Sequence, residues 1–418
     1  MKPKRVMLIA GEASGDALAA ELVTRLARAI PEAQYHPTAE VQPLTAPLPP
    51  VFFGAGGPRM AATGVELAVD MTRHSVTGVS DVIRKYGEFR RIFHELLRLA
   101  DQRQPDLVVL VDFPGFNLRF ARALRGMVRQ HERTFSNWEP RIVHYVSPQV
   151  WASRASRAKT LEANVDLLLC LFPFEKEWYA RHAPLLHVEC VGHPVLDRCL
   201  RHEENEAAQS ASATPAVLLL PGSRVGELKR HIPVMAEAVR QIHLQHPARF
   251  KMVLPNDSLL EQARMLLKDF RTEIEIQAGN LPQAMKTSSM AIASTGTVLL
   301  ECACYGLPVV ALYKTSWLTF QIGRRIAQVK FLSMPNLLAG EAVYPEFIQD
   351  EATPENLARE TLDLLTNTAR REEIKSKLTA IVAALGGPGA GDRAAGAIMD
   401  FTGWAWQPDL RTALLEAT

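Results

Sequence analysis

The chain repeats one local pattern: a short apolar run ends at a turn of glycine, proline or small polar residues, and a segment with helical apolar spacing follows. Runs of this kind are typical of strands buried on both faces of a parallel sheet. They occur in two series. The first comprises residues 5–10, 51–53, 107–111, 141–146, 167–172 and 186–191, and the second comprises residues 217–220, 250–254, 274–276, 290–293 and 309–312.

A polar stretch without apolar periodicity, residues 201–214, separates the two series and is expected to be a linker. The sequence therefore predicts an α/β fold with two Rossmann-like, doubly wound domains, an N-terminal one over residues 1–200 and a C-terminal one over residues 215–385. A length of 418 residues suits two such domains. Residues 386–418 are expected to form a helical tail that returns to the N-terminal domain or exchanges with a partner chain.

Two further segments depart from the pattern. Residues 31–50 are polar and proline-rich, which predicts an irregular insertion. Beyond residue 343 the chain is expected to be helical, apart from a sharp break in the glycine-rich stretch 385–391.

Ligands of open α/β sheets bind at the carboxyl ends of the strands, and one such end carries Thr295-Gly296-Thr297. This turn would present backbone N–H groups at a helix N-terminus, where a phosphate is favoured. Glu301 would follow about one helical turn later, within reach of a ribose. Thr295 and Thr297 could equally well serve only to cap the helix, and this stretch alone leaves both interpretations open.

Another strand end carries Gly222-Ser223-Arg224. Arginine in a tight turn offers a fixed fork of N–H donors to a pyrophosphate, whose charge must be stabilised if it leaves during a reaction. An arginine that is simply exposed in a turn is the alternative.

The first half has two strand ends of interest. Asp112 follows a buried run and is either a general base or a cap for the turn after it. The turn from Gly11 to Asp16 has only two glycines and no GxGxxG spacing, so it does not support a dinucleotide fingerprint. Ser14 and Asp16 in this turn either cap a helix or line a site.

Composition excludes several classes of protein. The net charge of +2 gives no overall electrostatic case for nucleic acid. Five cysteines without CxxC or Cys/His spacing argue against disulfides and structural zinc, and fit a reducing cytosol. The sequence has no D-x-D pair, so we expect no metal and no other cofactor. The apolar run 6–10 is too short for a signal sequence, and no run is long enough to span a bilayer.

Two segments combine apolar and basic residues, 80–103 and 317–330. Such segments suit an anionic membrane surface. A solvated helix face, or core packing with a basic rim, would produce the same pattern.

Five motifs in the same order resemble the lipid-A-disaccharide synthase family. They are Gly11-Glu12-Ala13-Ser14-Gly15-Asp16, His144-Tyr145-Val146-Ser147-Pro148, Pro221-Gly222-Ser223-Arg224, Thr295-Gly296-Thr297 with Glu301, and Pro335-Asn336 with Leu337-Leu338-Ala339-Gly340. The resemblance extends from about residue 5 to 400.

This resemblance implies a GT-B glycosyltransferase that inverts the anomeric centre. It would join UDP-2,3-diacylglucosamine to 2,3-diacylglucosamine 1-phosphate, giving a β-1,6-linked disaccharide phosphate and UDP. Asp112 falls on the residue thought to be catalytic in this family. The implied nucleotide and donor site comprises Gly222, Ser223, Arg224, Thr295, Gly296, Thr297, Glu301 and Asn336, and the implied acceptor side comprises Glu12, Ser14, Asp16, Asn117, Ser147 and Gln149.

The same resemblance implies a cytoplasmic protein that lies peripherally on the inner face of the cytoplasmic membrane and contacts anionic lipid, with a homodimer as one possible state. Two alternatives share the two-domain architecture: a UDP-N-acetylglucosamine 2-epimerase, which acts without an acceptor, and a non-catalytic nucleotide-sugar binding protein. An assay with and without the lipid acceptor would separate them.

Overall fold

The computed structural model describes residues 3–33, 48–74, 79–132, 137–203, 214–270, 273–326 and 329–404. The chain divides into two compact units. Unit 1 comprises Met1–Pro194 and Pro388–Thr418, and unit 2 comprises Val195–Gly387. The division at Pro194 places the helix α8 (Val195–Glu203) in unit 2, whereas the sequence analysis ended the first domain at residue 200.

The described residues of unit 1 form a seven-stranded parallel sheet in the order β3-β2-β1-β4-β5-β6-β7. Its strands are β1 (Arg5–Ala10), β2 (Val51–Gly56), β3 (Glu66–Asp70), β4 (Leu107–Val111), β5 (Arg141–Tyr145), β6 (Leu167–Cys170) and β7 (His187–Cys190). Its helices are α1 (Ala13–Ala33), α2 (Pro58–Ala62), η1 (Met71–His74), α3 (Val79–Arg103), α4 (Pro114–Glu132), α5 (Val150–Ser153), α6 (Arg157–Asn164), α7 (Pro173–His182) and α17 (Ala390–Thr402).

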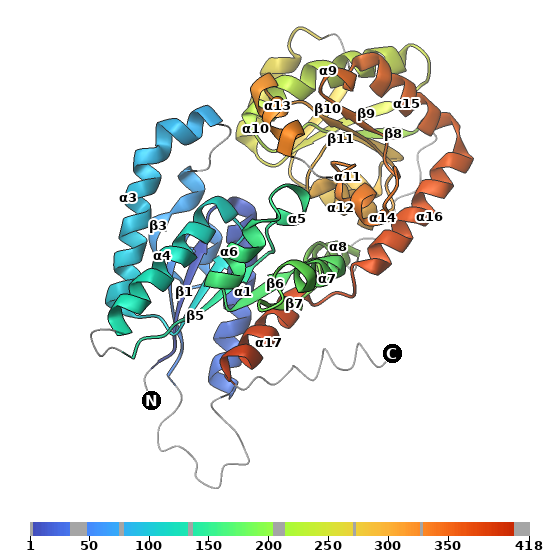
Figure 1. Ribbon diagram of the computed structural model, residues 1–418. Helices are drawn as coiled ribbons and strands as arrows, with labels where there is room; N and C mark the ends of the chain where they lie inside the picture. Colours follow the sequence, from blue (N-terminus) through green and yellow to red (C-terminus); the bar gives the residue numbers. More distant parts are fainter. Residues whose placement is uncertain are drawn as a thin grey trace. The chain divides into compact units, whose positions relative to one another are not determined.

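The core of unit 1 lies on both faces of this sheet. The helices α3, α4 and α6 cover one face, while α1 and α17 cover the other (Figure 1). All five residues of β4 have no exposed surface, as expected for a central strand, and each such side chain contributes about 1.5–3 kcal/mol by burial.

The C-terminal helix α17 belongs to unit 1 and packs against α1. Arg25 on α1 donates from Nε to Asp392 Oδ1 at 2.8 Å. Gly391 lies under the same guanidinium group, and a Cβ there would be only 2.5 Å from its central carbon. The two helices therefore approach closely through a small residue, and the tail returns to the N-terminal half of its own chain.

The described residues of unit 2 form a six-stranded parallel sheet in the order β10-β9-β8-β11-β12-β13. Its strands are β8 (Ala216–Leu220), β9 (Arg249–Leu254), β10 (Ile274–Ala278), β11 (Met290–Ser294), β12 (Val309–Tyr313) and β13 (Glu346–Ile348). Besides α8, its helices are α9 (Val225–His243), α10 (Asp257–Leu267), α11 (Leu281–Lys286), α12 (Val298–Cys304), α13 (Trp317–Ile326), α14 (Met334–Ala339), η2 (Gln349–Glu351), α15 (Pro354–Thr366) and α16 (Thr368–Ala384).

These two parallel sheets with helices on both faces confirm the predicted fold class. Two details differ from the sequence analysis. The chain beyond residue 343 is not wholly helical, because β13 pairs with β12 and forms the edge of the second sheet. The edge strand β3 was missed as well; β3 has only three apolar residues in a row and β13 only two, and both strands are partly buried.

The helix α1 begins at Ala13, four residues before the apolar spacing suggested, and continues to Ala33. The turn after β1 is correspondingly short. Of the predicted insertion at 31–50, residues 34–47 lie outside the described part of the chain.

Each sheet has one point at which the strand order reverses, and such switch points are where open α/β sheets bind ligands. In unit 1 the reversal lies between β1 and β4, which are followed by Glu12 and Asp112 respectively. In unit 2 it lies between β8 and β11, which lead into Arg224 and Thr295. Four of the predicted site residues, Glu12, Asp112, Arg224 and Thr295, thus follow the strands that flank the two switch points.

Candidate active site

Asp112 occupies a backbone conformation that non-glycine residues seldom adopt. Its φ is 48°, and that of Phe113 is also 48°. Two hydrogen bonds hold this geometry: Asp112 N donates to Tyr145 O at 2.8 Å, and Asn117 Nδ2 donates to Asp112 O at 2.7 Å. Left-handed residues that the surroundings hold in place cluster at functional sites, so this turn is the strongest structural candidate in unit 1.

The environment of Asp112 favours its neutral form. Burial, and next the negative charge of Glu12, raise the pKa of the Asp112 carboxyl to about 6, although a hydrogen bond from the Phe113 backbone opposes the shift. The side chain remains partly accessible. A carboxylate with this pKa is mostly ionised at neutral pH and is a stronger base than an ordinary aspartate.

Gly11 allows the turn after β4 to close over the end of β1. A Cβ at this position would lie 2.3 Å from the Phe113 ring. The ring in turn stacks on Phe116 with 5.8 Å between centroids. Glycine at position 11 is therefore required by the close approach of an aromatic ring, and no dinucleotide-binding loop is needed to explain it.

Asp16 and Asn117 form hydrogen bonds within the fold. The Asp16 carboxylate is 2% exposed and accepts from the backbone N–H groups of Gly57, Arg59 and Met60 at 2.8–3.0 Å, so it caps α2, which is distant in sequence. Asn117 Nδ2 also donates to Val111 O at 3.2 Å. Asn117 thus acts on Asp112 by positioning it.

The remaining acceptor-side candidates divide by exposure. Ser14 and Gln149 are exposed near the carboxyl edge of the sheet, and Glu12 is half-buried there. Ser147 is buried and its Oγ lies 3.1 Å from the Tyr179 hydroxyl. The accessible members, Ser14, Gln149 and Glu12, are the ones that a ligand could reach.

Glu175, a buried carboxyl at the start of α7, was not among the predicted residues. Its oxygens accept from Trp151 Nε1 at 3.0 Å and from the backbone N–H groups of Leu171 and Phe172 at 3.1 Å each. Burial raises the pKa of Glu175 to about 7 despite these donors. The carboxyl thereby fixes the half-buried Trp151 beside the ring of Phe174. The sequence signal for this role is that Glu175 is the third residue of a helix, the acidic position of a capping box.

In unit 2, the turn after β8 encloses a carboxylate. Ser223 N donates to Glu227 Oε2 at 2.9 Å, and Arg224 Nη1 lies 3.6 Å from Glu227 Oε1. Gly222 has φ 120°, and a Cβ there would come within 2.3 Å of Glu227 Oε2. Glycine at 222 therefore makes room for an anionic group at the N-terminus of the 19-residue helix α9, where anions are favoured.

Gly296 and Thr297 are exposed in the turn between β11 and α12, and Gly296 has φ 154°. Thr297 occupies the N-cap position without a side-chain capping bond, so the capping interpretation of this residue is not supported by its side chain. Glu301 lies in the first turn of α12 and pairs with Arg198 of α8, with 3.2 Å between Oε1 and Nη2. A ribose bound by Glu301 would have to share this carboxylate with Arg198.

His231 is a second residue that sequence analysis missed. It is fully buried, its Nδ1 lies 2.7 Å from Pro221 O, and its Nε2 lies 3.0 Å from Lys314 N. Because the Lys314 N–H must donate, Nε2 accepts and Nδ1 carries the proton. Burial lowers the pKa of His231, which keeps it neutral as a link between the ends of β8 and β12.

Asn336 is also buried, and its amide is bonded on both sides. Oδ1 accepts from Val343 N and Tyr344 N at 2.9 and 2.8 Å, while Nδ2 donates to Tyr344 O and Glu346 Oε1 at 2.8 and 2.7 Å. The side chain therefore organises the loop that leads into β13, and any effect on a donor sugar would be exerted through that loop.

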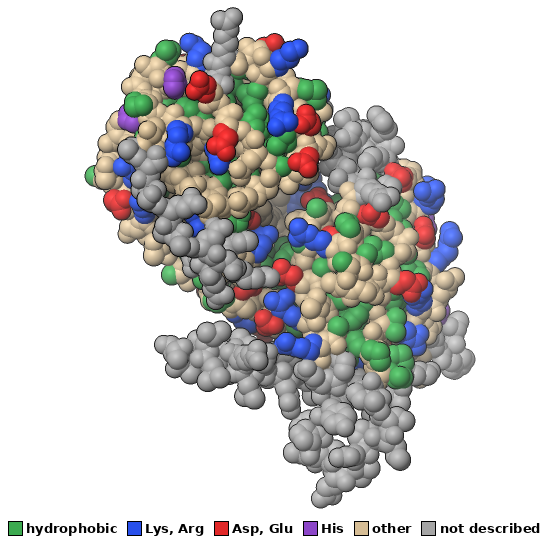
Figure 2. Space-filling model, turned by 180° about the vertical axis from the view of Figure 1, so that it is seen from behind, with side chains coloured by type: hydrophobic (Ala, Val, Ile, Leu, Met, Phe, Trp, Pro, Cys, Tyr) green, Lys and Arg blue, Asp and Glu red, His purple; other side chains and the backbone are tan. Residues whose placement is uncertain are grey.

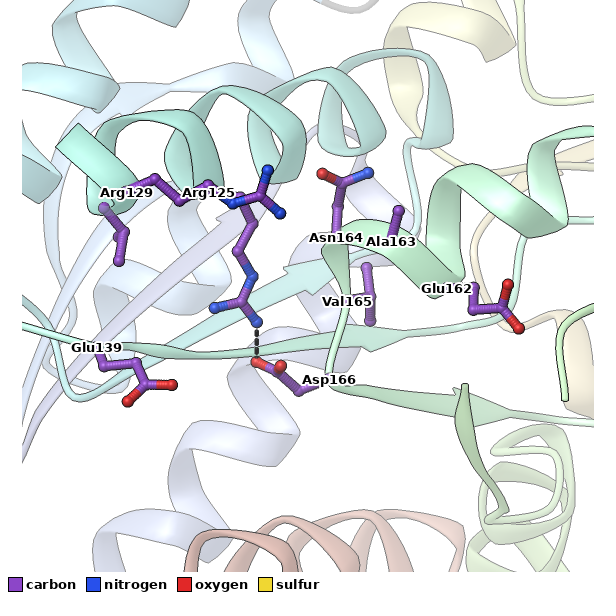
Figure 3. A pocket seen from close by; sticks show the side chains of 9 residues that line it. Arg125, Arg129, Glu139, Glu162, Ala163, Asn164, Val165 and Asp166 are labelled. Atoms are coloured by element: carbon purple, nitrogen blue, oxygen red, sulfur yellow. Dashed lines mark ion pairs between the residues drawn. The ribbon is translucent and has the colours of Figure 1, made fainter. Parts of the chain in front are cut away.

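A cavity of about 270 Å³ lies at the opposite, amino-terminal edge of the first sheet (Figure 3). Arg125 forms an ion pair with Asp166 in it, and Arg129, Glu139 and Glu162 add charges of both signs. This mixture favours no particular ligand, and none of the predicted site residues lines the cavity. The candidate site is therefore at the switch points and not in this cavity.

Charges on one face of the molecule and groups of possible metal ligands can be assessed for the described residues. On the face shown in Figure 2, acidic and basic side chains are interspersed without a large area of one sign among the described residues. The same residues contain no group of three or more His, Cys, Asp or Glu side chains that could hold a metal ion. None of the helices in the described ranges is long and apolar enough to cross a membrane.

Comparison with known proteins identifies the family. The sequence profile of the family described as lipid-A-disaccharide synthetase matches residues 6–393. Lipid-A-disaccharide synthase from Solibacter usitatus is 37% identical over 406 residues, covering 95% of this chain and 97% of that protein. The enzyme of the same name from Myxococcus xanthus is 33% identical over 405 residues, covering 96% and 98%.

The chain belongs to the lipid-A-disaccharide synthase family.

Family membership makes the chain a glycosyltransferase enzyme of lipid A biosynthesis, as the sequence motifs indicated. The solved structures it resembles share its fold. A putative UDP-N-acetylglucosamine 2-epimerase from Listeria monocytogenes aligns with a TM-score of 0.58 at 17% identity, covering 98% of this chain and 99% of that one. The calicheamicin glycosyltransferase CalG4 aligns with a TM-score of 0.55 at 15% identity, covering 96% and 99%.

These structural neighbours confirm the GT-B type of architecture for a lipid-A-disaccharide synthase family member. At such low identity they carry no information about the substrate. The epimerase alternative therefore rests on fold alone, whereas the synthase function rests on relatives that match almost the whole chain.

Proposed function

We propose that the chain joins UDP-2,3-diacylglucosamine to 2,3-diacylglucosamine 1-phosphate and releases UDP. The observation that carries this proposal is Asp112, an aspartate held in a left-handed turn at the switch point of unit 1 with its pKa raised to about 6. Transfer to a hydroxyl needs one base of this kind, since a single displacement inverts the anomeric carbon without a covalent intermediate.

In the proposed step, the 6-hydroxyl oxygen of the acceptor attacks C1 of the donor sugar. The new C1–O bond forms as the bond between C1 and the UDP oxygen breaks, and UDP leaves with that electron pair. Asp112 Oδ accepts the hydroxyl proton. Asn117 positions the Asp112 backbone, while Glu12, Ser14 and Gln149 contact the acceptor sugar.

Unit 2 would hold the donor. Arg224 supports the pyrophosphate because it is half-exposed at the N-terminus of α9, and the adjoining carboxylate of Glu227 already occupies an anion position there. The exposed backbone of Gly296 and Thr297 would contribute N–H groups, and Glu301 would accept hydrogen bonds from the ribose. Arg224 and these backbone groups balance the developing charge of UDP, so the proposal assigns no metal and no other cofactor.

The acyl chains of both substrates require contact with a membrane, and α13 is the better supported of the two predicted segments. Trp317 is 70% exposed at the start of α13, Arg324 and Arg325 are exposed in its last turn, and Lys330 is exposed beyond its end. An exposed indole beside cations suits the surface of an anionic leaflet. We infer peripheral attachment to the cytoplasmic face of the inner membrane through this segment.

The described part of α3 is less suited to this role. Its apolar residues Ile92 and Leu96 are buried in the core of unit 1, while Arg90, Arg91 and Arg98 are exposed. The side chains of residues 79–86 lie outside the description.

A product assay tests the proposed reaction. The purified full-length chain is incubated with both diacylated substrates in mixed micelles, and the lipid product is analysed by mass spectrometry. We expect one disaccharide monophosphate per UDP released, and no UDP release when the acceptor is left out. Conversion of UDP-N-acetylglucosamine to its 2-epimer in the absence of lipid would support the epimerase instead, and binding of either donor without turnover would contradict both enzymes.

A further inference from the structure

Two cysteines lie side by side at the carboxyl edge of the first sheet. Cys170 ends β6 and Cys190 ends β7, and the two are direct register partners of neighbouring parallel strands. Neighbouring strands are about 4.8 Å apart, which lies within the range of about 4.4–6.8 Å between Cα atoms that a disulfide requires. Cys170 is buried and Cys190 is half-buried, so only the second is open to solvent.

The two neighbouring thiols affect each other's ionisation. The Cys170 thiol donates to Phe172 O, which lies 3.7 Å from its sulfur. Contact with Cys170 lowers the pKa of Cys190, and the Gly192 backbone with the charges of Arg393 and Lys176 adds to the effect against a cost of burial. The same contact, with burial and the nearby Glu175, raises the pKa of Cys170. A half-buried thiol among cationic groups beside a second thiol is the usual setting of a reactive cysteine.

Arg393 of α17 forms hydrogen bonds close to Cys190 and close to the point where the chain returns to unit 1. Its Nε donates to Val191 O at 2.9 Å, immediately after Cys190, and its Nη1 donates to Pro388 O at 2.6 Å. The chain leaves unit 1 after Pro194 and re-enters it at Pro388. One guanidinium group therefore bonds to the residue that follows Cys190 and to Pro388, where the chain re-enters unit 1.

We propose that hydrogen peroxide oxidises Cys190 and Cys170 to a disulfide, with Cys190 as the attacking thiolate and Cys170 as the resolving thiol. Cys190 Sγ attacks one peroxide oxygen, the O–O bond breaks, and hydroxide leaves and takes up a proton to give water and a sulfenic acid. Cys170 Sγ then displaces the sulfenic hydroxyl, which leaves as a second water. Two thiols are oxidised by two electrons as one peroxide is reduced, and a dithiol reductant reverses the change.

Unit 2 contains a pair that serves as an internal comparison. Cys199 of α8 likewise lowers the pKa of Cys304 of α12, and Cys304 is half-buried like Cys190. The carboxylate of Glu301 lies close to Cys304 and opposes its ionisation, although Arg198 acts in the other direction. Cys302, in contrast, is fully buried and isolated from solvent. The order of reactivity should therefore be Cys190, then Cys304, with Cys302 last.

The experiment treats the reduced full-length protein with hydrogen peroxide, alkylates the remaining thiols and maps peptides by mass spectrometry. We expect a disulfide between the peptides of Cys170 and Cys190 to form first and to disappear with dithiothreitol. Without peroxide, iodoacetamide at pH 7 should label Cys190 roughly tenfold faster than Cys304.

Two variants fix the roles of the thiols. Cys170→Ser should stop oxidation at a sulfenic acid on Cys190, which dimedone traps, whereas Cys190→Ser should leave Cys170 as unreactive as Cys302. Lys176→Gln, at an exposed position, should slow labelling of Cys190 without affecting Cys304. Formation of the Cys199–Cys304 disulfide before the other, or equal labelling of Cys190 and Cys302, would overturn the proposal whatever the fate of the proposed transferase reaction.

Discussion

The two switch points hold their polar residues by different means. In unit 1 the left-handed backbone falls on Asp112 and Phe113, and hydrogen bonds from Asn117 and to Tyr145 keep it there. In unit 2 the corresponding turns place glycine at the positive φ positions, and their charged side chains pair with each other at the surface.

The contrast reflects what each edge would have to do. A base must keep one orientation relative to a reacting hydroxyl. A fixed left-handed backbone provides this orientation, although each such residue costs about 1–3 kcal/mol of conformational strain. A donor site must bind and release a charged nucleotide in each cycle. Ion pairs at partly exposed positions are weak and can exchange for a ligand at little cost, which suits Arg224 and Glu301.

The largest effect is expected at the fixed edge. Asp112→Asn preserves shape and removes the base, so kcat should fall roughly 10²–10⁴-fold while the melting temperature stays close to that of the wild type. Asp101→Asn, at a partly exposed site on α3, is the matched control and should retain activity. Wild-type turnover in purified Asp112→Asn protein would show that Asp112 is not the base and that its fixed turn has no catalytic role.

Arg224→Ala tests whether the exchangeable edge binds phosphate. Loss of charge-assisted hydrogen bonds of about 1.5–3 kcal/mol should weaken UDP binding roughly 30-fold, measured by calorimetry. Binding of uridine, which has no phosphate, should not change. The control is Arg240→Ala, because Arg240 forms an exposed pair with Glu237 on the same helix. An equal loss for uridine and UDP would mean that Arg224 supports the fold of the turn.

A smaller effect is expected at Glu301. If its carboxylate accepts from the ribose, the wild type should prefer UDP over 2′,3′-dideoxy-UDP roughly tenfold, and Glu301→Ala should bind both alike. Glu261→Ala, at an exposed pair on α10, should keep the preference. Retention of the preference in Glu301→Ala would assign the ribose contact to another residue and leave Glu301 as the partner of Arg198.

The smallest change is a shift in pH dependence. Asp112 is active as a base when ionised, so kcat of the wild type should fall as the pH drops through about 6. The negative charge of Glu12 disfavours that ionised form, and Glu12→Gln should therefore move this midpoint to lower pH. Glu21→Gln, further along α1, is the control. If the midpoint of the acidic fall in kcat is the same in Glu12→Gln, that fall reports the ionisation of a group other than Asp112.

Sequence reasoning recovered those parts of the fold that local patterns determine. The bounds of β4 followed directly from five consecutive apolar residues, and the polar turns after β1, β4, β8 and β11 were recognised before the strand order was known. The edge strands β3 and β13 were missed because each is partly buried and has only two or three consecutive apolar residues.

The candidate site was harder to predict where partners are distant in sequence. Asp16 caps a helix 41 residues or more away, and Asn336 binds a loop whose fold the local sequence does not specify. The anion position under Gly222 depends on Glu227 folding back from the first turn of α9. Residue type and spacing identified the strand ends correctly, but they did not distinguish side chains that face a ligand from side chains that support the turn.

The return of α17 to unit 1 has a consequence for the order in which the chain is made. The face of α17 formed by Ala394, Ala395, Ile398 and Met399 is buried, and the helix packs on α1, near the other end of the chain. A ribosome must therefore synthesise the whole of unit 2 before unit 1 can be completed, which takes roughly 10–40 s at common elongation rates. During that interval the nascent chain exposes the apolar surface of α1 that α17 later covers. This surface is a binding site for a chaperone until α17 has been synthesised.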